Sequence, residues 1–175
     1  MKDVLSLDDI HLSGKRVLYR VDINSPLHPE TGAFLDDGRL RAIIPTLNSL
    51  SEAKVVILGH QSRPGKDDFT DLSGHAERLR RILGRPIRFV PDVCGKEAID
   101  AIRSLKNGEI LCLDNVRMHN EEISLKKAEL DELRLSQIVM NLAPEFDAYV
   151  TDAFAAAHRN SCLLYTSDAA DESRG

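Results

Sequence analysis

Short hydrophobic runs recur along the chain, and each ends abruptly in polar or charged side chains. The first, RVLYRVDIN at residues 16–24, has β-branched and aromatic residues before Asp22 and Asn24. This length and composition are typical of a buried strand. The second, KVVILG at 54–59, is apolar almost without interruption and ends at His60. A continuous apolar run indicates a parallel strand that is covered on both faces.

Further apolar runs alternate with segments whose apolar residues have helical spacing. The additional strands are predicted at 87–90, 109–113 and 148–150. The predicted helices lie at 39–53, with a start or kink near Pro45, at 73–83, ended by Gly84, at 96–105, and at 121–142, ended near Pro144.

Alternating strands and helices without tight hairpins predict an α/β fold, a doubly wound parallel sheet of three layers that is Rossmann-like. In such sheets ligands bind beyond the carboxyl ends of the strands. This rule brings a set of polar residues towards one edge of the sheet: Asp22, Asn24, His60, Arg63, Asn115, Arg117, His158 and Arg159, with Arg39 near them.

Charge and hydropathy limit the classes of partner. The chain carries 23 Lys and Arg against 28 Asp and Glu, a net charge of −5. This balance does not provide the broad positive field of nucleic-acid-binding proteins, so we expect no nucleic-acid partner. No apolar run approaches the roughly 18 residues that cross a bilayer, and the acidic start of the chain is unlike a signal peptide, so we expect no membrane partner.

The cysteines indicate a reducing compartment. Cys94, Cys112 and Cys162 are odd in number and have no close metal-ligand spacing. We therefore expect a cytoplasmic protein with free thiols, and we expect Cys112, within an apolar run, to lie in the core.

Arginines and histidines gathered at one edge of an acidic protein suit a small ligand with several negative charges. Asp22 and Asn24 would add hydroxyl recognition beside them. Alternatively, such loop residues are merely solvated, and Asp22 caps a turn. Of the remaining histidines, His11, His28 and His75 are expected at the surface, and the place of His119 stays open.

Several other kinds of site are excluded by spacing. The loop HQSRPGKDD lacks the spacing of a phosphate-binding Walker A loop, and no G-x-G-x-x-G follows a strand. G-x-S-x-G and H-E-x-x-H are also absent from the sequence. We therefore expect neither a nucleotide site nor a metal site in this chain.

Five segments, GKRVLYRVDIN, LDDGRLRA, ILGHQSRP, LDNVRMHNEE and VTDAFAAAHR, resemble in their order the successive motifs of phosphoglycerate kinase, especially archaeal members. The resemblance covers about residues 10 to 161. It implies the N-terminal, 3-phosphoglycerate-binding domain of a two-domain enzyme. The implied reaction is reversible phosphoryl transfer between ATP and the carboxylate of 3-phosphoglycerate, which gives 1,3-bisphosphoglycerate and ADP, with Mg²⁺ and closure of the two domains.

The resemblance also implies roles for individual residues. Arg39 is the catalytic candidate, because fixed positive charge near the phosphoryl group in flight stabilises the transition state. Asp22 and Asn24 are expected to hold the hydroxyl region of the substrate. Its phosphate is assigned to His60, Arg63, Arg117 and Arg159.

Two departures from the family pattern carry expectations. Ser62 stands where glycine is common, and we expect it to restrict the backbone of its loop. Residues 162–175 have no counterpart in the resemblance, so we expect an incomplete domain at 1–161 and a non-native tail. ATP, ADP and Mg²⁺ would then bind to an absent C-terminal nucleotide-binding domain, and the chain alone would be inactive.

Two other functions remain open on the sequence alone. One is a stand-alone module that binds an anionic phosphometabolite without catalysis. The other is a generic α/β scaffold for protein contacts, in which the strand-end residues only stabilise the fold.

Overall fold

The computed structural model describes residues 6–125 and 127–153. Within these residues the strands are β1 (Arg16–Arg20), β2 (Lys54–Leu58), β3 (Arg88–Phe89), β4 (Ile110–Cys112) and β5 (Ala148–Thr151). The α-helices are α1 (Gly38–Ala42), α2 (Ile44–Ser49), α3 (Ser73–Leu83), α4 (Lys96–Arg103), α5 (Asn120–Ser124), α6 (Leu130–Arg134) and α7 (Gln137–Leu142), and the short 3-10 helices are η1 (Leu7–Asp9), η2 (Val116–Met118) and η3 (Ala143–Glu145).

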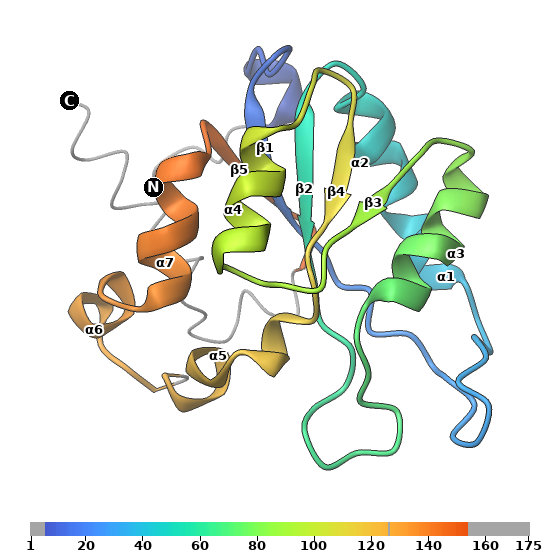
Figure 1. Ribbon diagram of the computed structural model, residues 1–175. Coiled ribbons are helices and arrows are strands. Elements are labelled where there is room, and N and C mark those ends of the chain that lie inside the picture. The colour runs from blue at the N-terminus through green and yellow to red at the C-terminus, as the bar shows by residue number, and fades with distance from the viewer. Residues whose placement is uncertain (1–5, 126, 154–175) are drawn as a thin grey trace.

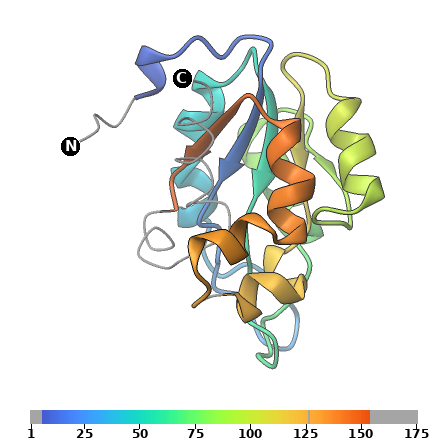
Figure 2. The same cartoon turned by 90° about the vertical axis from the view of Figure 1, so that its left-hand side faces the viewer.

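The described strands form one parallel sheet in the order β3-β4-β2-β1-β5. From β1 through β2 to β3 the chain moves towards one edge, and from β3 through β4 to β5 it moves back. Right-handed crossovers must then place the first helices on one face and the later helices on the other. Figure 2 shows this arrangement, with α1 and α2 on one side of the sheet and α4 and α7 on the opposite side. The predicted doubly wound α/β fold is confirmed.

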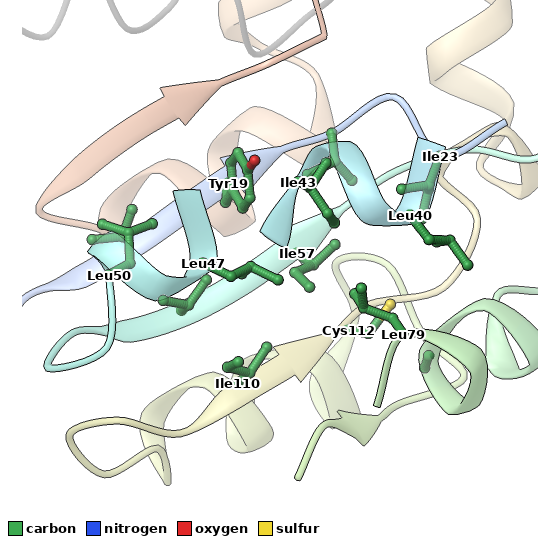
Figure 3. Packing of buried hydrophobic residues seen from close by; sticks show 14 of the residues in the cluster. Tyr19, Ile23, Leu40, Ile43, Leu47, Leu50, Ile57, Leu79, Ile110 and Cys112 are labelled. Atoms are coloured by element: carbon green, nitrogen blue, oxygen red, sulfur yellow. The ribbon is translucent and has the colours of Figure 1, made fainter. Parts of the chain in front are cut away.

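Each face of the sheet has its own hydrophobic core. On one face, side chains of β1 and β2 such as Tyr19 and Ile57 pack against Leu40 and Leu47 of α1 and α2 (Figure 3). On the other face, the alternate strand residues pack against α4 and α7. The continuous apolar run of β2 is thus explained, because successive side chains enter opposite cores.

Two of the predicted helices are interrupted. The segment 39–53 breaks between α1 and α2, and Pro45 occupies the first turn of α2, as expected from its missing N–H. The prediction of one helix over 121–142 is wrong, because α5, α6 and α7 are separate. Ser136 starts α7 anew: its Oγ accepts a hydrogen bond from the backbone N–H of Val139 at 3.3 Å.

Cys94 and Cys112 are buried, free thiols, and Cys112 lies in the core as predicted. Burial raises the pKa of Cys112 to about 12, so this thiol is un-ionised at neutral pH. Cys162 lies outside the described residues.

In the part of the chain that the structure describes, none of the helices has the length and apolar character needed to cross a membrane.

Candidate functional site

The predicted site residues follow strands that end at the same edge of the sheet. The connections after β1, β2 and β4 all leave the sheet at the lower edge in Figure 1. The connection after β2 leads to α3 on one face, whereas the chain after β4 leads to helices on the other face. This divergence is the arrangement that opens a ligand crevice in doubly wound sheets.

The connections after β1, β2 and β4 are joined by hydrogen bonds at Ser62. The backbone N–H of Ser62 donates to Oδ1 of Asn24 at 2.8 Å. The carbonyl oxygen of Ser62 accepts from Nη1 of Arg117 at 2.6 Å. Asn24 follows β1, Ser62 follows β2, and Arg117 lies in η2 after β4. The structure therefore brings together Asn24, Arg117 and the loop that carries His60 and Arg63.

Arg39 and Asp22 form an ion pair between α1 and the segment after β1, with Nη1 of Arg39 donating to Oδ2 of Asp22. The Arg39 side chain is 50% exposed and that of Asp22 is 21% exposed. Solvent screens a pair this open, so it orients the guanidinium more than it stabilises the fold. The exposed half of Arg39 remains accessible to a ligand anion.

His60 and Arg63 differ in accessibility, because His60 is half-buried and Arg63 is exposed. His60 directly follows Gly59, at a point where the chain must lie close to the segment after β1. A Cβ on Gly59 would lie 2.9 Å from Cγ1 of Ile23. Glycine at this position lets the His60 loop lie directly against the Asp22–Asn24 segment.

A buried network of hydrogen bonds joins the segments after β1 and β2 to α3. Gln61 Oε1 accepts from the backbone N–H of Ser25 at 2.9 Å, and Gln61 Nε2 donates to the Ser25 carbonyl at 3.0 Å. His75 Nε2 lies 2.9 Å from the same Oε1. Because an amide oxygen can only accept, Nε2 of His75 carries the proton. The prediction of a surface His75 is wrong: it is 1% exposed, since α3 turns it inward onto Gln61.

Asn115 belongs to this supporting layer. It is buried, and its Nδ2 donates to the carbonyls of Gln61 and Thr70, both at 2.8 Å. Its Oδ1 accepts from the backbone N–H of Arg117 at 3.1 Å. Asn115 therefore fixes the backbone on which Arg117 stands.

The other described histidines differ in how exposed they are. His11 is exposed, as predicted, and His28 is half-buried. His119 is also half-buried, with Nδ1 3.8 Å from a carboxylate oxygen of Glu121.

Sequence reasoning missed a buried ion pair beside the site. Arg20, at the end of β1, is 4% exposed and donates from Nη2 to Oε1 of Glu122 in α5 at 3.1 Å. The alternation along β1 places Arg20 on the same face as the buried Leu18, which signals burial, but its partner lies 102 residues further along the chain. The pair ties α5, which follows Arg117, to β1.

Arg159, together with His158, lies outside the described residues. Among the residues that are described, no group of three or more His, Cys, Asp or Glu could hold a metal ion.

Comparison with known proteins gives consistent matches. The family model described as phosphoglycerate kinase matches residues 7–170. The phosphoglycerate kinase of Methanothermobacter thermautotrophicus is 47% identical over 161 residues, a match that covers 91% of this chain and 39% of that relative.

Solved structures of phosphoglycerate kinases also match this chain. The crystal structure of the Pyrococcus horikoshii phosphoglycerate kinase has a TM-score of 0.86 at 36% identity and covers 92% of this chain and 39% of that one. The structure of the Coxiella burnetii phosphoglycerate kinase has a TM-score of 0.67 at 26% identity, and the match covers 90% of this chain and 37% of that one. The chain thus spans about two fifths of the length of these relatives.

Proposed function

Because the chain belongs to the phosphoglycerate kinase family, we propose that it supplies the 3-phosphoglycerate-binding half of an enzyme that transfers a phosphoryl group between ATP and 3-phosphoglycerate. In this proposal residues 1–161 belong to the N-terminal domain of the longer enzyme and residues 162–175 are a non-native tail, although the family model extends to residue 170. The domain with the ATP site would lie in the part of the relatives that this chain does not span.

The convergence at Ser62 carries the proposal. Asn24 and Arg117, from different connections, both bond to this one residue, which lies between His60 and Arg63. A carboxamide and several cationic groups therefore share one edge of an acidic protein. This combination matches a small acid that carries a phosphate, a carboxylate and a hydroxyl group.

Each residue has a chemical role in the proposal. The positive charges of His60 when protonated, Arg63, Arg117 and Arg159 attract the phosphate. Asp22 and Asn24 bind the hydroxyl region by accepting and donating hydrogen bonds.

Arg39 would act on the reacting end of the ligand. Its guanidinium, oriented by Asp22, stabilises negative charge on the phosphoryl oxygens in the transition state. The carboxylate of the substrate attacks the phosphoryl group directly, so no covalent enzyme intermediate is formed.

ATP and Mg²⁺ belong to the proposed activity of the longer enzyme. The described residues contain no cluster that fits a metal ion, so we assign them no ligand in this part of the chain. Bound Mg²⁺ would neutralise charge on the nucleotide phosphates.

Calorimetric titration of 3-phosphoglycerate into the chain tests the proposal. We expect weak binding that Arg63→Ala and Arg117→Ala each reduce at least about tenfold, since each removes a charge-assisted contact to an anion. Arg81→Ala is the matched control, because Arg81 is exposed on α3 and pairs with Glu77. A folded chain that gives no heat at millimolar ligand, or equal losses in all three variants, would contradict the proposal.

The same titration separates the metabolite-binding module and the scaffold from the kinase. A stand-alone module would bind tightly without nucleotide, whereas half of a two-domain site binds weakly because it cannot close on its partner domain. A scaffold for protein contacts would leave the affinity unchanged in every arginine variant.

A further inference from the structure

Ser62 has an unusual backbone conformation for its residue type. Its φ is 55°, and among the described residues it is the one non-glycine residue with a positive φ. L-amino acids adopt this left-handed region reluctantly, because their Cβ approaches the following carbonyl oxygen. Something in the surrounding structure must hold Ser62 in place.

Asp68 bonds to the side chain of Ser62. The hydroxyl of Ser62 donates to Oδ1 of Asp68 at 2.5 Å, and both residues are half-buried. The intervening loop turns back on itself through backbone bonds from Lys66 to Arg63 and from Phe69 to Lys66, at 3.2 and 3.0 Å. These turns return Asp68 to Ser62, so one side-chain bond closes the loop.

The conformation at Ser62 determines where two candidate ligand groups lie. Its N–H is bonded to Asn24 and its carbonyl oxygen to Arg117. A rotation about φ of Ser62 would move the carbonyl side of the residue relative to its N–H. The two side chains from different connections would then lose their common anchor.

We propose that Asp68 is a positioning residue: by accepting the hydroxyl of Ser62 it holds this serine at its positive φ, and so keeps Asn24 and Arg117 in a geometry that binds a phosphorylated three-carbon acid. The inference rests on the function proposed above and assigns residues that support the ligand groups without touching the ligand. Glycine at position 62 would need no such restraint, since it adopts a positive φ without steric cost. The role of Asp68 is therefore tied to serine at 62.

A double-mutant cycle in the 175-residue chain tests this dependence. We expect Asp68→Ala to weaken 3-phosphoglycerate binding about fivefold, the order of the penalty for a left-handed L-residue. Ser62→Gly should stay within about twofold of the unmodified chain, and adding Asp68→Ala to it should change little. Asp68→Asn keeps an oxygen acceptor and should restore most of the affinity.

Asp67→Ala is the matched control for charge. Asp67 is an exposed neighbour, so its replacement removes the same negative charge near the anion site without removing the Ser62 bond. Equal effects of Asp67→Ala and Asp68→Ala, or an equal loss from Asp68→Ala in the serine and glycine backgrounds, would overturn the inference.

Hydrogen exchange separates this inference from the proposed function. The amide of Ser62 is protected by Asn24, so Asp68→Ala should accelerate its exchange about fivefold with no ligand present, and in the Ser62→Gly background it should not. If the chain binds no 3-phosphoglycerate but shows this exchange pattern, the proposed function fails and the pairing of Ser62 with Asp68 stands. Unchanged exchange in Asp68→Ala would overturn the pairing itself.

Discussion

At the scale of single residues, burial decides the protonation state of His75. His75 lies on a helix whose neighbouring Arg78, Arg80 and Arg81 face the solvent, yet its ring is buried against Gln61. Burial lowers the pKa of His75 to about 4, while the nearby Asp71 carboxylate and the Ile23 backbone act in the opposite direction. At neutral pH the ring is therefore uncharged, which suits its bond to an amide oxygen.

The lowered pKa of His75 predicts a loss of stability in acid. Its pKa rises to the ordinary value of 6.5 in the unfolded chain, so between pH 6.5 and about 4 the unfolded state binds a proton that the folded state does not. The free energy of unfolding should fall across this window by about 3 kcal/mol and be unaffected by His75 above it.

Urea unfolding at pH 7 and pH 4.5 measures this contribution. His75→Gln should lose less stability between the two pH values than the unmodified chain, whereas His11→Gln, at an exposed position, should behave like the unmodified chain. Identical losses in the unmodified chain and His75→Gln would contradict the prediction.

At the scale of elements, helix boundaries depend on individual caps. The charged stretch before α7 offers no continuous apolar face, and α7 begins only where Ser136 accepts the backbone N–H of Val139. From there Ile138, Val139 and Leu142 enter the core beside α4. The cap thus sets which side chains of this segment are buried.

Removing the cap should destabilise the fold measurably. Ser136→Ala leaves the Val139 amide without its acceptor and should lower the free energy of unfolding by about 1 kcal/mol. Ser136→Thr should retain most of the stability that the cap contributes, because threonine also caps helices. Ser124→Ala, at the exposed end of α5, is the control and should change stability by less than about 0.5 kcal/mol. Equal effects at both serines, measured by urea unfolding, would argue against the cap.

On the scale of the whole molecule, the chain places its candidate ligand groups at one edge of a sheet that is covered on both faces. It spans 39% of the phosphoglycerate kinase of Methanothermobacter thermautotrophicus. In the proposed reaction the nucleotide must meet the acceptor in a site that excludes water. The half of such a site that we propose for this chain cannot provide that enclosure alone.

We therefore expect no phosphoryl transfer by the isolated chain with 3-phosphoglycerate, ATP and Mg²⁺, as measured by release of ADP. The full-length Methanothermobacter relative is the positive control. An ADP-forming activity that co-elutes with the chain on size-exclusion chromatography, and that is absent from the Arg39→Ala variant, would contradict the expectation.

Much of the architecture could be predicted from the sequence, because hydrophobic periodicity is a local property and parallel α/β sheets obey general topological rules. The strands, the two covered faces and the placement of Asn24, His60, Arg63 and Arg117 at strand ends all followed from pattern. The family resemblance, carried by motifs, is confirmed by the match over residues 7–170.

Only the tertiary structure decided which polar residues are buried and with what they pair. The partner of Arg20 lies 102 residues away, and Arg117 reaches the carbonyl of Ser62 across 55 residues. The hydroxyl of Ser62 meets Asp68 because the intervening loop folds back on itself. A buried polar side chain is tolerated only where a hydrogen-bonding partner meets it, and that partner is set by how distant segments pack. The pattern of one segment cannot contain this information.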